Sequence, residues 1–244
     1  MQNIIYTIQH SKRFLGKCII CLVLFVTPIS KCFSQESLNQ SGAWYMYFYS
    51  LDLDKSEWGV QGDLQYRNWN ALGDLEQLLV RSGVTFKPKE TTLKFTLGLA
   101  NITSGAPGAS NKTTAENRVY QEALLPQKIG KRLYLTHRFR YEQRFVQNQD
   151  FRTRYRYNLF LNIPLNKSVL EKDALYLALY NEIFINGQSE IGNARTVSLF
   201  DRNRTYLGAG WFLNSKTRIQ LGWMNQKTPA SGKAQWQVSV HSDF

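Results

Sequence analysis

Arginines at alternate positions dominate residues 138–156, which read RFRYEQRFVQNQDFRTRYR. A guanidinium group is permanently charged, and its several N–H donors bind carboxylates and phosphates through paired hydrogen bonds. Because successive side chains of an extended strand point to opposite faces, these arginines share one face of each predicted strand. The stretch therefore has the chemistry of an anion-binding surface or of an ion-paired wall.

Two glutamates on the same faces are candidates for pairing with these arginines. A turn centred near residues 147–148 predicts three facing pairs, since same-face residues oppose each other across a hairpin: Arg144 with Arg152, Glu142 with Arg154, and Arg140 with Arg156. A turn near residue 169 then brings Glu182 beside Arg156, and the next strand brings Arg204 to its other side. We name this set the charge ladder, and its members are Arg138, Arg140, Glu142, Arg144, Arg152, Arg154, Arg156, Glu182, Arg202 and Arg204.

The ladder has two interpretations that depend on the width of the barrel that holds it. A narrow barrel fills its interior with side chains, and charges buried there must be paired. A wider basic lumen attracts anions instead. With 10 to 12 strands the interior lies between the filled eight-stranded barrels and the open porins. We therefore favour a mostly paired wall, with both arrangements present at different depths.

Residues suited to catalysis or metal binding are few. His10 precedes the predicted mature chain, His137 lies on the apolar face, and only His241, beside Ser239, lies on the polar face. Hydrolysis needs a nucleophile with a base in reach, and a histidine near a serine in one strand is common by chance. The acidic residues 52–57 lack the glycine and ligand spacing of an EF-hand. We assign no catalytic residue, no metal and no cofactor.

The elements that position the ladder are amphipathic strands. A transmembrane barrel strand alternates apolar and polar residues over about ten positions, with the apolar side toward lipid. Eleven segments follow this pattern: 43–53, 60–69, 78–86, 93–99, 117–127, 133–145, 152–163, 174–185, 201–213, 218–223 and 236–244. Bacterial single-chain barrels have even strand numbers. We therefore expect 10 to 12 strands, with either one strand missed or the first lying outside the wall.

The connections and the chain end also fit an antiparallel transmembrane β-barrel with short periplasmic turns and longer outer loops. Short connections (88–90, 129–131, 214–216) alternate with longer polar ones (104–116, 186–199, 227–234). Trp236, Val238, Val240 and the terminal Phe244 share a face. This ending resembles the signature by which the barrel-assembly machinery recognises outer-membrane barrels, although Ser242 departs from it, and Phe244 is the predicted insertion signal.

Residues 1–34 read as a signal peptide and residues 35–244 as one barrel domain. Basic residues precede the apolar run 18–29, and small residues surround a cut before Gln35. A lipoprotein reading of Cys32 is disfavoured by Lys31 before it. All three cysteines leave with the segment, so the mature chain has no thiol. The chain is basic, with a formal net charge of +12, but export and the lack of a recognition motif exclude nucleic acid as a partner.

The alternation of apolar and polar residues does not by itself decide which face of the strands contacts water. A soluble secreted barrel is therefore the competing fold. Aromatic residues make up 14% of the chain and gather near strand ends, as the interface girdles of a membrane barrel require. The tryptophans concerned are Trp44, Trp58, Trp69, Trp211, Trp223 and Trp236. Together with the terminal phenylalanine they favour a barrel in a lipid bilayer.

Several short motifs, taken in order, resemble an uncharacterised bacterial family known as domain of unknown function 2490. The motifs are ENRVYQ at 116–121, HRFRYEQRF at 137–145, RTRYRY at 152–157, YNEIFIN at 180–186, FDRNRTYLGAG at 200–210 and LGWMNQ at 221–226. The resemblance implies an outer-membrane barrel of a Gram-negative bacterium and supplies no activity.

We expect slow passage or binding of a small anionic solute through the arginine-lined lumen. The alternatives are a barrel enzyme acting on envelope lipids and a soluble secreted β-barrel binding protein.

Overall fold

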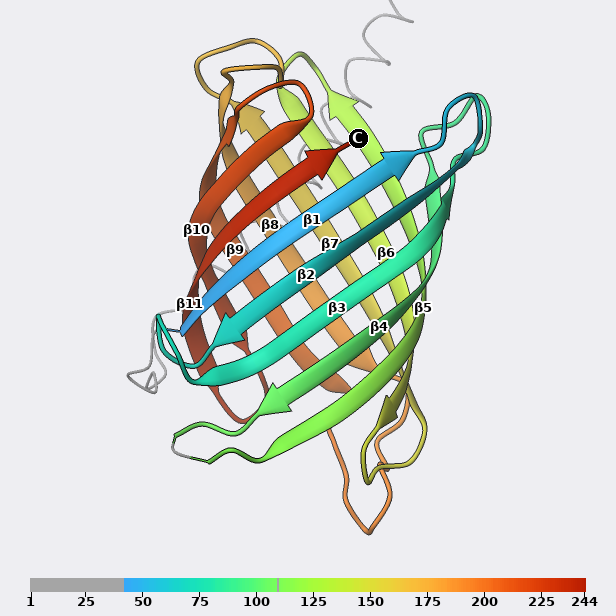
Figure 1. Cartoon of the computed structure of the whole chain (residues 1–244), viewed down its shortest axis with the longest axis vertical. Helices are drawn as coiled ribbons and strands as arrows, with labels where there is room; N and C mark the ends of the chain where they lie inside the picture. Colours follow the sequence, from blue (N-terminus) through green and yellow to red (C-terminus); the bar gives the residue numbers. More distant parts are fainter. Residues whose placement is uncertain (1–41, 109) are drawn as a thin grey trace, which may run out of the picture. The chain divides into compact units, whose positions relative to one another are not determined.

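In the computed structural model, residues 42–108 and 110–244 are described, and they form a closed β-barrel (Figure 1). The predicted signal peptide lies outside these residues. No helix in the described part is long and apolar enough to cross a membrane. The strands are β1 (Gly42–Asp52), β2 (Trp58–Asn68), β3 (Leu75–Phe86), β4 (Lys94–Gly105), β5 (Thr113–Ile129), β6 (Leu133–Val146), β7 (Arg152–Pro164), β8 (Leu175–Asn186), β9 (Phe200–Phe212), β10 (Thr217–Lys227) and β11 (Gly232–Asp243).

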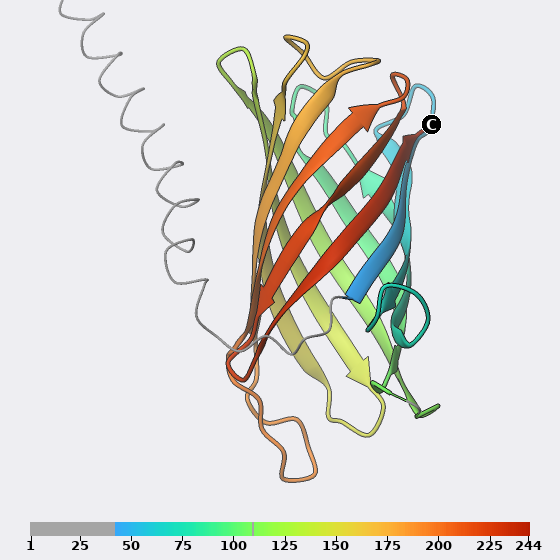
Figure 2. The ribbon, with the colours of Figure 1, turned by 90° about the vertical axis from the view of Figure 1, so that its left-hand side faces the viewer.

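The barrel closes through a parallel pair formed by the first and last strands. All other neighbours are antiparallel, so eleven strands leave β1 and β11 running in the same direction (Figures 1 and 2). Their register runs from Gly42 opposite Gln235 to Ser50 opposite Asp243. The number of strands lies within the predicted range of 10 to 12. The expectation of an even number of strands was wrong, because β1 belongs to the barrel wall and no strand was missed within the described residues.

The two ends of the barrel differ in their connections. We call the end that holds Phe244 the C-terminal end, and its connections are 53–57, 87–93, 130–132, 165–174 and 213–216. The opposite, N-terminal end has the connections 69–74, 106–112, 147–151, 187–199 and 228–231. The three short turns predicted from the sequence lie at the C-terminal end, and the three predicted longer loops lie at the N-terminal end. The difference in length is smaller than predicted, because 228–231 is as short as 213–216 and the long connection 165–174 lies at the end of the predicted short turns.

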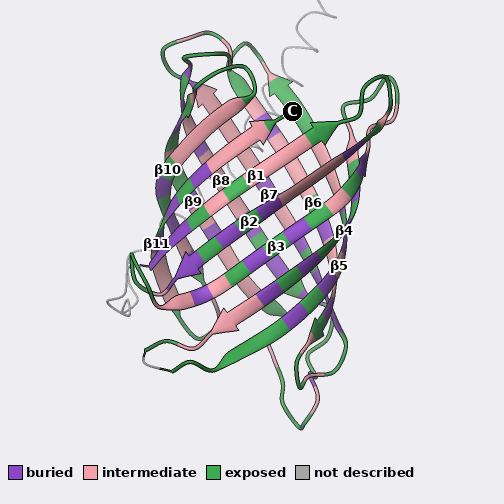
Figure 3. Ribbon diagram, viewed as in Figure 1, coloured by how far each residue is buried: buried purple, intermediate pink, exposed green. Residues whose placement is uncertain are grey.

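Apolar side chains cover the outside of the barrel, and polar side chains fill its interior. Leu99 and Leu221 expose 66% and 55% of their surface, whereas Thr96 and Glu142 face inward and are buried. Buried and exposed positions therefore alternate along the strands (Figure 3). A soluble barrel has the opposite polarity, because it hides its apolar side chains in the core.

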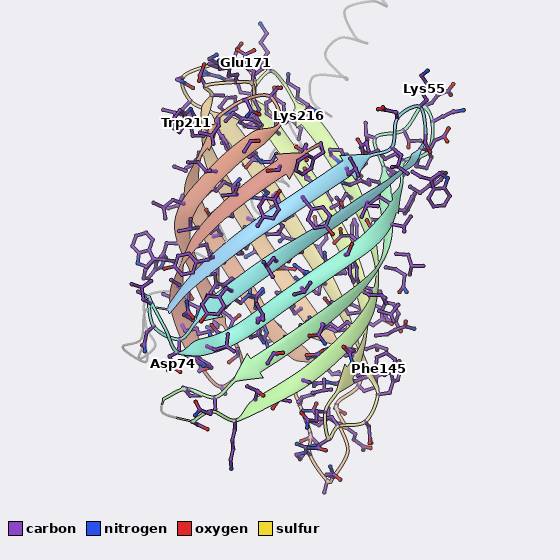
Figure 4. All side chains as sticks on the ribbon, in the orientation of Figure 1. Lys55, Asp74, Phe145, Glu171, Trp211 and Lys216 are labelled. Carbon is purple, nitrogen blue, oxygen red and sulfur yellow. The ribbon has the colours of Figure 1, made fainter. Side chains whose placement is uncertain are left out.

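Outward aromatic residues lie near both ends of the barrel. Figure 4 places Trp211 near the C-terminal end and Phe145 near the N-terminal end. Trp58 packs on Phe86 close to the C-terminal end, and Trp223 packs on Trp236 towards the other end. Trp44 corrects the sequence analysis, because it points inward, is 2% exposed and lies against the Arg67 guanidinium.

Glycines let inward tyrosines lie flat against the wall. A Cβ atom on Gly98 would stand 2.3 Å from the Tyr120 ring, and one on Gly208 would stand 2.2 Å from the Tyr206 hydroxyl. Any larger residue at these positions would push the ring into the lumen. Tyr206 also stacks on Tyr180 with ring centroids 4.9 Å apart. The Arg140 guanidinium lies over the Tyr120 ring, 4.6 Å from its centroid.

Candidate functional site

The charge ladder lies on the inner face of the barrel with the predicted hairpin register. Strands β6 and β7 place Arg140 opposite Arg156, Glu142 opposite Arg154, and Arg144 opposite Arg152. The short turn 147–151 keeps the inward positions of the two strands in phase. All the ladder side chains of this hairpin face the interior, and Glu142 is the most deeply buried of them.

Glu142 is the centre of the ladder. Its Oε2 atom accepts a hydrogen bond from Arg154 Nη2 at 2.6 Å, and its Oε1 atom accepts one from Arg156 Nη1 at 2.6 Å. Arg118 and Arg140 approach the same carboxylate at 3.6 and 3.9 Å. One carboxylate, 1% exposed, therefore lies among four guanidinium groups.

Glu182 forms the second centre, with partners that differ partly from those predicted. Its Oε1 atom accepts hydrogen bonds from Arg156 Nη2 at 2.6 Å and Arg138 Nη2 at 2.7 Å. In the strand register Glu182 lies opposite Asn158, which is two residues along β7 from Arg156. Arg204 faces Glu182 across β8 and β9 as predicted, yet its Nε donates to Gln226 at 2.8 Å, and no ion pair joins it to Glu182 within the described residues.

Four further carboxylates pair with inward arginines and were not included in the predicted ladder. Glu116 binds Arg118 and Arg144, Glu122 binds Arg140, Asp63 binds Arg81, and Asp201 binds Arg154 and Arg202, all at 2.5–3.1 Å. The alternation signal was sufficient to find three of them. Glu122 and Asp63 lie directly opposite their arginines in register, and Glu116 lies two positions before Arg118 on the same face.

Three inward arginines have no carboxylate in ion-pair contact within the described part of the chain. Arg67 donates to Gln65 and Gln77 at 2.6 and 2.8 Å, and Arg204 donates to Gln226. Arg152 forms no ion pair there, and its buried Nε atom has no hydrogen-bond partner. The interior therefore retains positive charge that its own carboxylates do not neutralise.

Aromatic rings hold several of these guanidinium groups in place. The inward ring of Phe184, 1% exposed, has Arg156 at 4.5 Å, Arg204 at 4.8 Å, Arg154 at 5.2 Å and Arg202 at 5.8 Å from its centroid. Such cation–π contacts orient guanidinium planes without neutralising their charge. The guanidinium groups around Phe184 are therefore held in fixed orientations.

Two cavities occupy the interior. The mixed cavity, of about 330 Å³ on the side of the C-terminal end, is lined by acidic, basic and aromatic residues, including Asp243, Arg218 and Phe160. The arginine cavity, of about 200 Å³ on the side of the N-terminal end, is lined by nine arginines and one carboxylate, Glu116. Four arginines line both cavities: Arg67, Arg81, Arg156 and Arg204. We call this shared part of the lining the waist.

The mixed cavity also holds the serine and histidine that the sequence placed together. Ser239 Oγ and His241 Nε2 lie 3.0 Å apart, and the imidazole stacks on Phe48 with centroids 4.6 Å apart. Within the described residues no carboxylate forms a hydrogen bond to His241. The arrangement is therefore a dyad without the orienting acid that completes a hydrolytic triad.

No group of three or more histidine, cysteine, aspartate or glutamate side chains within residues 42–108 and 110–244 is arranged to hold a metal ion. In the acidic region 52–57, Asp52 pairs with Lys87 and Glu57 pairs with Lys89. The Lys89 ammonium lowers the pKa of Glu57 below its usual value. Lysines therefore neutralise these two carboxylates.

Comparison with known proteins identifies a family, and the description of that family names no activity. The model of the family described as protein of unknown function (DUF2490) matches residues 41–237. An uncharacterized protein of Methylorubrum extorquens is 27% identical over 193 residues, which cover 75% of this chain and 80% of the relative. No solved structure matches the chain.

Proposed function

The chain belongs to this family of proteins of unknown function, and we propose that it is an outer-membrane β-barrel of a Gram-negative bacterium that binds small anionic solutes and passes them slowly. The apolar outer surface and the aromatic residues near both barrel ends support a bilayer as the surrounding medium. Membrane insertion through Phe244 and the barrel-assembly machinery belongs to the same proposal.

The observation that carries the solute class is the composition of the arginine cavity. Nine arginines and a single glutamate line it, and three of these arginines have no carboxylate in contact within the described residues. Cations fixed in a low-dielectric interior attract anions and repel other cations. This arrangement favours an anion over a sugar or a cation as the ligand.

The waist accounts for slow rather than free passage. Arg67, Arg81, Arg156 and Arg204 line both cavities, and Arg81 and Arg156 are fixed there by Asp63 and by Glu142 with Glu182. An anion crossing the barrel therefore passes between immobilised guanidinium groups. Binding strong enough to admit the anion also delays its release.

Reconstitution in a planar bilayer with a potassium chloride gradient tests this function. We expect small currents whose reversal potential follows chloride, and we expect Arg204→Gln to weaken that selectivity. The exposed Arg132 in the turn 130–132 supplies the matched control, Arg132→Gln, which should leave selectivity unchanged. Cation-selective currents would refute the proposal, as would a barrel that neither conducts nor binds anions.

The Ser239–His241 contact supports a second candidate, an enzyme acting on envelope lipids. A serine-reactive phosphonate probe distinguishes the two functions. Covalent labelling that is lost in Ser239→Ala would favour the enzyme, whereas an unlabelled parent protein favours the anion barrel.

A further inference from the structure

The arginine cavity has more positive charge than its neighbouring carboxylates neutralise. Six of its nine arginines contact Asp63, Glu116, Glu142, Glu182 or Asp201. The other three, Arg67, Arg152 and Arg204, have no carboxylate partner within the described residues. Buried cations without a counter-charge are costly, and a bound anion removes that cost.

Two of the arginines that line the cavity carry unused hydrogen-bond donors. The Nε atoms of Arg152 and Arg202 are buried and have no partner within the described residues, and both side chains line the cavity. Arg152 begins β7, and Arg202 lies near the start of β9, so two separate strands contribute the free donors. Arg152 is 8% exposed, so little of the side chain contacts bulk solvent.

We propose that the arginine cavity binds a compact, multiply charged phosphoryl anion, such as inorganic phosphate or pyrophosphate, with Arg152, Arg202 and Arg204 as ligands. This assignment rests on the proposed anion function and names the ligand class. Arg67, Arg152 and Arg204, which have no carboxylate partner within the described residues, call for more than one negative charge, and a phosphoryl group offers several acceptor oxygens that match the guanidinium fork. The volume of about 200 Å³ is below the range of about 300–1,000 Å³ for drug-sized ligands, and it suits a small ion.

The ring of Phe184 holds several cavity arginines in place. The guanidinium groups of Arg154, Arg156, Arg202 and Arg204 lie within 5.8 Å of its centroid. Arg154 and Arg156 already donate to carboxylates, whereas Arg202 keeps an Nε donor without a partner within the described residues. Forked donors held in fixed positions favour a tetrahedral group with several oxygens over a chloride ion.

Isothermal titration of the refolded barrel in a phosphate-free glycoside detergent tests the site. Pyrophosphate, inorganic phosphate and acetate are compared at matched ionic strength and neutral pH, where a phosphoryl group carries about two negative charges. We expect pyrophosphate to bind about tenfold or more tightly than acetate, and Arg152→Gln to weaken it by about tenfold. Arg132→Gln, at the opposite end, should bind like the parent, and Arg152→Lys should restore part of the affinity.

Arg152→Gln also has a structural control within the same experiment. Because Arg152 has no carboxylate partner in the described residues, removing its charge should leave the melting temperature of the free barrel unchanged or higher. The increase in melting temperature caused by pyrophosphate should disappear. Lower stability without ligand would mean that Arg152 is part of the structural wall, which would overturn its assignment as a ligand.

The outcomes separate this site from the proposed function. Equal affinity for pyrophosphate and acetate overturns the phosphoryl site, while chloride selectivity in the bilayer would still support the anion barrel. If the protein shows neither a preference for pyrophosphate nor chloride selectivity, both the phosphoryl site and the anion barrel are overturned. Repeating the melt in vesicles with and without lipopolysaccharide distinguishes the source of the phosphoryl group: stabilisation by added pyrophosphate alone supports a free anion, and stabilisation by lipopolysaccharide alone supports a lipid phosphate.

Discussion

Replacing Glu142 by glutamine removes the one negative charge on which four guanidinium groups converge. Arg154 and Arg156 bind its two oxygens at 2.6 Å, and Arg118 and Arg140 lie at 3.6 and 3.9 Å. The side chain is 1% exposed, so water does not replace the lost charge. Removing one partner of a buried ion pair costs about 3–5 kcal/mol of folding free energy.

The surrounding carboxylates place the expected loss near the lower end of this range. Each of the four arginines retains a second anionic contact: Arg154 with Asp201, Arg156 with Glu182, Arg118 with Glu116, and Arg140 with Glu122. Glutamine also still accepts a hydrogen bond. The repulsion among the arginines acts in the opposite direction once Glu142 is neutral. Two like unit charges about 4 Å apart repel by about 4 kcal/mol at an effective dielectric constant of about 20. We expect a destabilisation of about 3 kcal/mol for Glu142→Gln.

Two assays measure this loss. The temperature at which the compact gel band shifts to the unfolded position should fall in Glu142→Gln, and urea unfolding from vesicles gives the free energy. The bilayer current should become more selective for anions, because Arg156, which lines both cavities, loses an anionic partner. Glu57→Gln, in an exposed turn paired only with Lys89, is the matched control and should change neither property. If Glu142→Gln melts like the parent and keeps its selectivity, the ladder is a solvated face and the paired-wall reasoning is wrong.

Three further predictions address the membrane, the chain end and export. Leu221→Arg on the outer face should cost about 2–4 kcal/mol in bilayers, and Gln220→Arg on the inner face should cost much less; equal tolerance would favour a soluble barrel. Phe244→Ser should reduce insertion in cells while leaving refolding into detergent unchanged, and normal insertion would argue against the signal. Mass spectrometry should find Gln35 at the start of the mature protein, and a fatty-acylated Cys32 would contradict cleavage there.

The register of the β6–β7 hairpin could be predicted because a short turn and strict alternation leave few choices. Placing Glu142 opposite Arg154 required only the parity of the residues and the centre of the turn. The same reasoning, extended one strand further, would have paired Glu122 with Arg140. These contacts are local, and each is contained in a pair of neighbouring strands.

Contacts between strands that are not neighbours could not be predicted in this way. Arg204 lies opposite Glu182 on one side and Gln226 on the other and binds Gln226, but it also packs against the ring of Trp44, three strands away along the wall. Long side chains reach past their nearest neighbours, and their direction depends on the circumference and stagger of the closed barrel. The parallel closure of β1 on β11 was missed because it contradicts the even strand numbers of bacterial barrels.

The uneven pairing of the inward arginines links the wall to the proposed function. Near its middle, Glu142 and Glu182 hold the arginines together, so the charges there contribute to folding. Towards the N-terminal end, Arg152 lacks such a partner within the described residues. A wall selected for stability alone gains nothing from an unpaired buried cation, since an apolar residue there would cost less. The cost of this cation is offset when an anion binds, and we therefore expect a bound anion to stabilise the barrel most around Arg152, at the start of β7.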